Sequence, residues 1–280
     1  MGILSIQSHV ATGRVGNAIV AFALQRLGHE VWPVHTVMFS NHPGRGGYRG
    51  KVRAAEDLTE IVTGLDEQGV FARCDAVLGG YLGDAKNGAV LLAAVDTVRS
   101  RKPSTLFFLD PVMGDAGKGI YVSPDVVAFY RNAIGDADVL APNAFELGVL
   151  TDRAIAGPDD AIAAARSLLG PRLRTVFVTS VDMPSASELV TLAVDAERAI
   201  GVATPRLEID PKGAGDLFMA LAAAELLDGG SLETVLKRSV SVVWGLADAA
   251  RKAPEPGDLP VIEHQDILVS PERTFCAERL

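Results

Sequence analysis

The chain has few cysteines and lacks the features of exported and membrane proteins. Among its 280 residues only Cys74 and Cys276 are cysteines, and neither belongs to a CxxC pair, which argues against a disulfide scaffold and a cysteine-ligated metal site. The N-terminus, MGILSIQSHVATG, has no basic segment and soon turns polar, so neither a signal peptide nor a membrane span is expected. These absences predict a cytoplasmic protein.

Positive charge is also scarce. The chain has 26 Lys and Arg residues against 35 Asp and Glu, a net charge of −9 and a pI near 5.1. Because a nucleic-acid surface needs clustered Lys and Arg, nucleic acid is not an expected partner. Small anions can still be held by backbone N–H groups and a few local cations.

The apolar pattern predicts one α/β domain spanning residues 1–280, since no linker or low-complexity segment divides it. Mostly unbroken apolar runs indicate strands at 2–8, 30–37, 75–80, 105–111, 138–143 and 175–180. Helical patterns fall near 15–27, 55–68, 84–100, 124–134 and 158–169, and a long helix is expected from 232 to at least 247. Residues 188–204 resemble two strands around a tight turn. This alternation predicts a mostly parallel sheet with helices on both faces.

Polar residues interrupt the pattern where the predicted strands end. Parallel sheets bind ligands at the carboxyl ends of their strands, so these side chains are expected to converge on one rim. They are Ser8, His9, Thr36, Ser40, Asn41, His42, Tyr81, Asp110, Asn143, Glu146, Thr179 and Ser180.

The stretch DPKGAGDLFMALAAAELL, residues 210–227, places two glycines and Asp216 before an apolar helical run. Gly213 and Gly215 let the backbone approach a ligand, and the first turn of the helix offers free N–H groups to an anion. Two interpretations of Asp216 are open on local grounds: a helix cap, or a carboxylate beside a bound phosphate.

Seven ordered segments resemble the motifs of pyridoxal kinases, within the ribokinase-like superfamily. They are IQSHVATGRVGN (6–17), HTVMFSNHP (35–43), GYLGD (80–84), DPVMGDAGKGIYV (110–122), APNAFEL (141–147), VTS (178–180) and GAGDLF (213–218). The resemblance implies a three-layer α/β/α kinase domain, often a homodimer. It also implies transfer of phosphate from Mg-ATP to the 5′-hydroxymethyl group of pyridoxal, pyridoxine or pyridoxamine.

The resemblance assigns roles at the phosphate end, within residues 110–250. Asp216 is similar to the catalytic base, and the backbone of Gly213, Ala214 and Gly215 is similar to the anion hole. Asp110 and Glu146 resemble residues that position Mg²⁺, partly through water, and K⁺ is a further candidate cofactor. Asn143, Thr179 and Ser180 resemble ATP contacts.

At the other end, within residues 1–85, the resemblance places the vitamin pocket. Ser8 is similar to the residue that binds the pyridine ring, and Thr36, His42 and Tyr81 resemble residues that line it. Two segments resemble mobile loops: 42–50, with Arg45 and Arg49, and the flap 115–122, with Lys118 and Tyr121. The remaining histidines, His9, His29, His35 and His264, show no metal-ligand spacing.

Lys212 departs from the small or neutral residue that related kinases often have there; it is expected either near the phosphates or in solvent. Hydroxymethylpyrimidine kinase is an alternative within the same enzyme class, although the SNH and GYLG context favours pyridoxal. A non-catalytic B6-binding protein is a second alternative, but such a protein would not need the phosphate end. A dinucleotide-dependent dehydrogenase is disfavoured because no GxGxxG follows the first strand.

Overall fold

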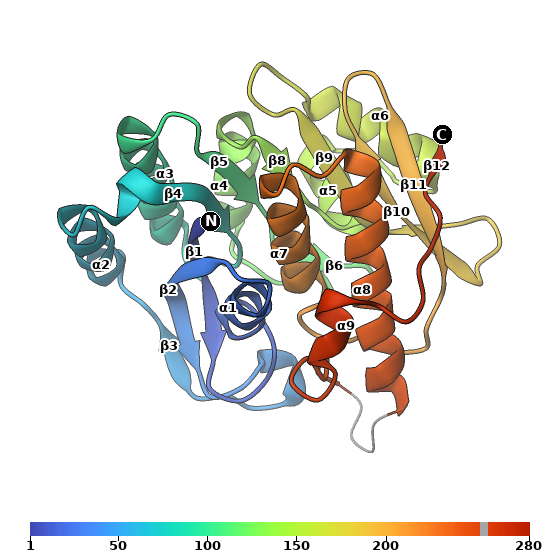
Figure 1. Cartoon of the computed structure of the whole chain (residues 1–280), viewed down its shortest axis with the longest axis horizontal. Helices are drawn as coiled ribbons and strands as arrows, with labels where there is room; N and C mark the ends of the chain where they lie inside the picture. Colours follow the sequence, from blue (N-terminus) through green and yellow to red (C-terminus); the bar gives the residue numbers. More distant parts are fainter. Residues whose placement is uncertain (253–256) are drawn as a thin grey trace.

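A ten-stranded sheet runs through the protein in the order β12-β11-β10-β9-β8-β5-β4-β1-β2-β3 (Figure 1). The computed structural model describes residues 1–252 and 257–280. The strands of this sheet are β1 (Gly2–Val10), β2 (Glu30–Phe39), β3 (Gly50–Val52), β4 (Cys74–Gly79), β5 (Leu106–Leu109), β8 (Val139–Leu140), β9 (Thr175–Asp182), β10 (Glu188–Val194), β11 (Ala199–Pro205) and β12 (Glu278–Arg279). A separate two-stranded hairpin consists of β6 (Gly114–Asp115) and β7 (Gly119–Ile120).

The centre of the large sheet is parallel and its edges are antiparallel. Strands β2, β1, β4, β5, β8 and β9 pair in parallel, whereas β3 on one side and β10, β11 and β12 on the other pair antiparallel. The predicted mostly parallel sheet is therefore confirmed. The hairpin expected over 188–204 is also confirmed, as β10 and β11.

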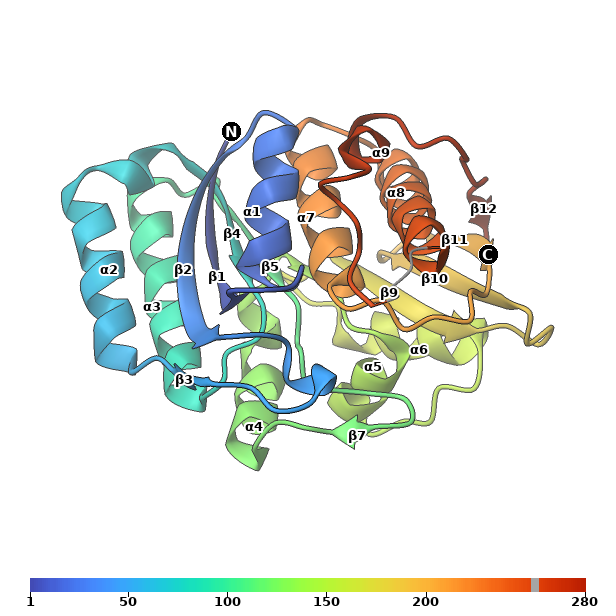
Figure 2. The ribbon, with the colours of Figure 1, turned by 90° about the horizontal axis from the view of Figure 1, so that it is seen from below.

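Helices cover both faces of the sheet (Figure 2). One face carries α1 (Asn17–Arg26), α7 (Ala214–Leu227), α8 (Leu232–Lys252) and α9 (Gln265–Val269), and the other carries α2 (Ala55–Glu67), α3 (Ala85–Arg101), α4 (Pro124–Ala133), α5 (Ala144–Thr151) and α6 (Pro158–Leu168). Short 3₁₀ turns lie at Pro43–Arg45, Val70–Arg73 and Ile134–Asp136. Successive residues of a strand pack on opposite faces of the sheet: Ile3 packs in the core beside α1, and Leu4 packs in the core beside α2. The α/β/α layering thus follows from strands that are apolar on both sides.

The end of α1 and the buried face of α8 lie where the sequence predicts them. Gly28 follows α1 with a left-handed φ of 89°, and its N–H bonds the Gln25 carbonyl, as expected after a helix end. The α8 pattern buries Val235, Leu236 and Val240, which confirms the core face predicted for the long helix. None of the described helices is both long enough and apolar enough to cross a membrane.

Several short elements differ from the sequence prediction. Strand β8 has two residues rather than the six expected over 138–143, because Pro142 lacks an N–H and Asn143 already caps α5. The pattern did not predict α5, α9 or the three-residue edge strand β3, which are too short to show a period. The predicted flap over 115–122 overlaps the β6–β7 hairpin, which spans residues 114–120.

Candidate functional site

The polar residues at the strand ends form a line along one rim of the sheet. Strand order places them as Thr179 (β9), Asn143 (after β8), Asp110 (after β5), Tyr81 (after β4), Ser8 (β1) and Thr36 (β2). In Figure 2 the arrowheads of β1 and β2 point towards the side of the molecule where the β7 hairpin lies. The convergence predicted from sequence is confirmed. We call the end of the line with Asp110, Asn143 and Glu146 the carboxylate-rich end, and the end with Ser8, Thr36 and Tyr81 the hydroxyl-rich end.

Asp216 lies in the first turn of α7 but does not cap it. The helix begins at Ala214 with Gly213 as its N-cap, at a left-handed φ of 86°, and Asp216 is the third helical residue. Its Oδ2 instead accepts a hydrogen bond from the Gly16 N–H at 2.9 Å. The interpretation of Asp216 as the helix cap is therefore wrong: glycine supplies the left-handed cap, which leaves the carboxylate available to another loop.

Asp216 and Asp110 share a poorly solvated environment. A Cβ added to Gly215 would lie 3.8 Å from Asp110 Oδ2, so the start of α7 passes close to the end of β5. Burial raises the pKa of Asp216, and the Gly16 N–H partly offsets this rise. Burial also raises the pKa of Asp110, and the charges of Glu146 and Asp216 add to the effect. A cation or a proton at this point relieves that repulsion.

Glu146 uses both carboxylate oxygens to hold backbone. Oε2 accepts from the Asn143 N–H at 3.0 Å, completing a capping box, while Oε1 accepts from the N–H groups of Met113 at 2.9 Å and Gly114 at 3.4 Å. Burial raises the pKa of Glu146 to about 8, although these three N–H groups lower it. Asn143 and Glu146 thus form a capping box, and Glu146 also joins residues 113–114, just before the flap, to α5.

Thr179 and Ser180 lie beside Asn143, as their strand position requires. Thr179 forms a parallel bridge with Asn143, and its N–H bonds the Pro142 carbonyl at 3.0 Å. Ser180 is exposed and has a φ of 58°, an unusual conformation for a non-glycine residue inside a strand. The two hydroxyl groups therefore lie at the carboxylate-rich end of the rim.

At the hydroxyl-rich end, Ser8 and Thr36 lie on the paired strands β1 and β2, and Tyr81 follows β4. Ser8 and Thr36 are buried, and the Thr36 hydroxyl donates to the Tyr81 carbonyl at 2.6 Å. Tyr81 is half-buried and packs with the cluster of Val10, Val37 and Phe39. This contact fixes the turn after β4 against β2.

The 42–50 segment contains three residues singled out from the sequence, His42, Arg45 and Arg49. His42 Nδ1 accepts from the Gly44 N–H at 3.0 Å and so caps the short turn at 43–45, while burial and the nearby Lys212 charge lower its pKa. Arg45 pairs with Asp258 at 3.0 Å. Arg49 contributes its backbone N–H to the Ser40 hydroxyl at 2.9 Å. The 42–50 segment is therefore held both internally and by the 257–258 segment.

Lys118 of the flap and Lys212 share the carboxylate of Asp210. Lys118 Nζ lies 2.8 Å from Asp210 Oδ2, and Lys212 Nζ contacts the same oxygen. The Lys212 side chain is only 18% exposed, so of the two placements considered from sequence, free extension into solvent is wrong. Tyr121 is half-exposed, and its backbone N–H bonds the Met113 carbonyl at 3.0 Å.

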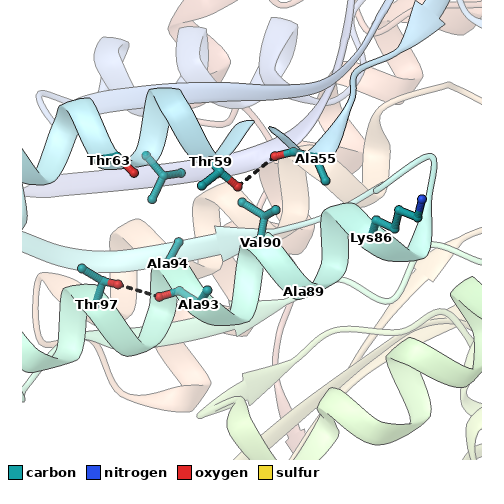
Figure 3. A pocket seen from close by; sticks show the side chains of 10 residues that line it. Ala55, Thr59, Thr63, Lys86, Ala89, Val90, Ala93, Ala94 and Thr97 are labelled. Atoms are coloured by element: carbon teal, nitrogen blue, oxygen red, sulfur yellow. Dashed lines mark hydrogen bonds between the residues drawn. The ribbon is translucent and has the colours of Figure 1, made fainter. Parts of the chain in front are cut away.

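A groove elsewhere on the surface contains none of the predicted site residues. It lies between α2 and α3, has a volume of about 470 Å³ and is lined by Ala55, Thr59, Val62, Thr63, Lys86, Ala89, Val90, Ala93, Ala94 and Thr97 (Figure 3). The Thr59 and Thr97 hydroxyls donate to carbonyls of their own helices, Ala55 at 2.9 Å and Ala93 at 2.8 Å. The groove therefore presents mainly methyl groups and lacks the convergent polar atoms of the rim.

Sequence reasoning missed three partners at the site. Asp210 and Asp258 had no signal beyond being acidic, and two of their cations, Lys118 and Arg45, lie far away in the sequence. Gly16 lies inside the 6–17 motif, but nothing in the linear sequence pairs it with a residue 200 positions away. Within residues 1–252 and 257–280, no group of three or more His, Cys, Asp or Glu side chains is arranged to hold a metal ion by itself.

Known proteins resemble this chain over its whole length. Residues 57–261 match the family described as phosphomethylpyrimidine kinase. The chain is 43% identical to "Pyridoxal kinase PdxY" of Rubrobacter xylanophilus, over 100% of this chain and 98% of the relative, and 41% identical to the protein of the same name in Deinococcus radiodurans, over 99% and 96%.

A solved structure of pyridoxal kinase from Leishmania donovani, in complex with ADP and pyridoxamine, has a similar fold. It superposes with a TM-score of 0.92 at 29% identity and covers 100% of this chain and 99% of its own. Together with the full-length sequence matches, this likeness shows the ribokinase-like α/β/α fold expected from the motifs. The chain belongs to the pyridoxal kinase family.

Proposed function

We propose that this protein transfers the γ-phosphoryl group of ATP to the 5′-hydroxymethyl group of pyridoxal. The observation that carries this proposal is the position of Asp216. It lies in the first turn of α7, bonded to the β1–α1 loop at the hydroxyl-rich end and close to Asp110 at the carboxylate-rich end. A base in this position can serve an acceptor on one side while a phosphate donor lies on the other.

Asp216 is assigned the role of base. Its raised pKa makes it a better proton acceptor than an ordinary aspartate, and phosphoryl transfer demands mainly alignment, with the proton leaving late. The backbone N–H groups of residues 213–216 face the same space at the positive end of the helix dipole. They are assigned to the negative charge that develops on the transferring group.

The carboxylate-rich end is assigned to Mg-ATP. When bound, Mg²⁺ supplies charge neutralisation to the phosphates. The donor set fits this ion, because Asp110 offers a buried carboxylate and magnesium usually keeps waters and phosphate oxygens as its remaining ligands. Glu146 already binds three N–H groups, so its assigned role is to act through water and through the flap backbone. Asn143, Thr179 and Ser180 are assigned to ATP; K⁺ stays a prediction without an assigned site.

The hydroxyl-rich end is assigned to the pyridine ring. Ser8 is expected to bond the ring, with Tyr81 as an aromatic wall. The Thr36 hydroxyl already donates its hydrogen bond to the Tyr81 carbonyl, so it can offer the ligand only its oxygen lone pairs. His42 can bind a ligand through Nε2, because its Nδ1 already accepts the Gly44 N–H.

The assembly is part of the same proposal. Residues 1–280 form one kinase domain, with the vitamin pocket mainly from 1–85 and the Mg-ATP site mainly from 110–250. The active form is proposed to be a cytoplasmic homodimer. Light scattering coupled to size-exclusion chromatography tests the dimer directly, and a monomer mass for the active fraction would refute it.

The test of function is phosphorylation by the purified protein with ATP and Mg²⁺. We expect pyridoxal 5′-phosphate to accumulate, followed by its absorbance, with slower turnover of hydroxymethylpyrimidine in a parallel reaction. Faster turnover of hydroxymethylpyrimidine would favour the alternative, a hydroxymethylpyrimidine kinase. The description of the matched family, phosphomethylpyrimidine kinase, supports including this substrate. Pyridoxal binding without turnover of either substrate would favour the binding-protein alternative.

A further inference from the structure

The loop between β1 and α1 contributes a backbone N–H that has no role of its own in the assignments above. The Gly16 N–H donates to Asp216 Oδ2 at 2.9 Å, joining residues 200 positions apart. The neighbouring Arg14 carbonyl packs on the other end of the same turn, since a Cβ on Gly213 would lie only 1.9 Å from it. The segment 14–16 therefore touches both the cap of α7 and its carboxylate.

Glycine is required at position 16 on two independent grounds. Its φ of 53° and ψ of −138° fall in a region that residues with a side chain rarely adopt. A Cβ there would also lie 2.2 Å from the Ser8 carbonyl oxygen and 2.3 Å from the Ser8 hydroxyl. Gly16 thus lies directly against the residue assigned to the pyridine ring while its N–H points to the base.

The structure also fixes the direction of this N–H. The Val15 carbonyl, which shares a peptide plane with the Gly16 N–H, accepts from the Ala18 N–H at 3.1 Å, and the Gly16 carbonyl accepts from the Val20 N–H at 3.0 Å. The next residue, Asn17, is buried, and its Nδ2 lies 3.1 Å from the Val34 carbonyl and 3.3 Å from the Ser5 carbonyl. An N–H held in this way needs little reorganisation when substrate binds.

We propose that the backbone N–H of Gly16 is a positioning group for phosphoryl transfer: it fixes Oδ2 of Asp216, so that Oδ1 faces the acceptor hydroxyl. This inference rests on the proposed function, because it needs Asp216 to be the base. It adds that the vitamin-binding half orients the base, so the two ends of the rim are coupled through the 14–16 segment. The same bond lowers the pKa of Asp216 and keeps it ionised over a wider pH range.

The test compares Gly16→Ala with Gly28→Ala, a matched control at the other end of α1. Gly28 also has a positive φ, of 89°, but a Cβ there meets nothing within 4 Å. We expect Gly16→Ala to lower kcat by about tenfold to a hundredfold and to move the acid limb of its pH profile to higher pH. Gly28→Ala should stay within about twofold of wild type. An unshifted acid limb in Gly16→Ala would overturn the proposal.

A double-mutant cycle separates this inference from the function itself. If Gly16 acts through Asp216, adding Gly16→Ala to Asp216→Asn should cost less than about threefold more. An equal loss in both backgrounds would mean that Gly16 acts only through Ser8. Normal turnover of Asp216→Asn alone would instead overturn the assignment of the base.

Hydrogen exchange tests the contact without any change at Gly16. In Asp216→Ala, exchange of the Gly16 amide should accelerate at least about tenfold, whereas the Ile19 amide, bonded within α1, should not change. Unchanged exchange at Gly16 would overturn the proposal even if Gly16→Ala fails to fold.

Discussion

The two ends of the rim differ in their electrostatics, because one holds buried carboxylates and the other holds buried neutral groups. At the carboxylate-rich end, burial raises the pKa values of Asp110 and Glu146, and the charges of Glu146 and Asp216 add to the rise at Asp110; burial also raises the pKa of Asp216. At the hydroxyl-rich end the buried groups are neutral, and Thr36 already has its partner in the Tyr81 carbonyl. An added cation therefore stabilises the carboxylate-rich end, whereas the neutral groups at the hydroxyl-rich end need no counter-ion. This difference suits a metal–nucleotide complex on one side and a neutral ring on the other.

The strongest way to break this comparison is to remove the charge that lies between the two ends. Asp216→Asn should lower kcat by about a hundredfold to ten-thousandfold, because the amide cannot accept the proton, while the melting temperature stays near that of wild type. Steady-state formation of pyridoxal 5′-phosphate measures the effect. Asp228→Asn, at the C-terminal end of the same helix, is the control and should keep full activity.

Glu146→Gln tests the carboxylate-rich end alone. Glu146 has a folded pKa of about 8, above its ordinary value, so its contribution to stability is complete at low pH and declines as pH rises towards 8. The glutamine variant should be less stable than wild type by about 1–3 kcal/mol near pH 5, because it loses an acceptor for the three N–H groups. That deficit should shrink by about pH 8.5, since glutamine does not ionise.

Denaturant unfolding at several pH values measures this trend, with the exposed Glu233→Gln as control. The Glu146→Gln variant should also raise KM for Mg-ATP and leave KM for pyridoxal unchanged. A deficit that grows with pH would contradict the assigned protonation of Glu146.

The hydroxyl-rich end is tested by Thr36→Val, which removes the donor to the Tyr81 carbonyl. Leaving that acceptor unpaired costs about 1–2 kcal/mol, so KM for pyridoxal should rise by about fivefold to thirtyfold, with KM for ATP unchanged. Thr59→Val is the matched control, because its exposed hydroxyl bonds only its own helix (Figure 3). An equal rise in both KM values would show that Thr36 does not act at the hydroxyl-rich end alone.

The smallest effect is expected where a loop is held over the rim by a partly exposed ion pair. Arg45→Ala breaks the 3.0 Å pair with Asp258, in which the arginine side chain is 42% exposed. Such pairs contribute at most about 1 kcal/mol, so KM for pyridoxal should rise by about twofold and stability should hardly change. A change in kcat larger than about tenfold would give this loop a part in the chemistry that the comparison does not assign to it.

Much of the fold could be read from the sequence, because long apolar runs and helical periods report burial directly. Five of the six central strands and the longer helices fall close to their predicted ranges, and the rim follows from strand polarity. Short elements such as β8 and α5 depend on capping and on a proline, which no period records. Their ends were therefore the least predictable.

The candidate site, like the fold, could be predicted only in part. Residue types at strand ends indicated which side chains meet, but hydrogen-bond partners distant in sequence could not be predicted. The cap of α7 shows why: Gly213 adopts the left-handed conformation, and Asp216 turns to Gly16 on a different loop. Which group caps a helix depends on what else the carboxylate can reach.

The contact between Gly16 and Asp216 also has a meaning for the order of folding. Strand β1 pairs with β2 and β4, which follow it early in the chain, whereas α7 reaches α1 only after some 200 residues have been synthesised. Contacts of such high sequence separation form late, because the loop must close before they contribute. A nascent chain can therefore assemble the vitamin-binding half early and gain activity only when α7 docks. Recovery of catalysis during refolding should report that last step.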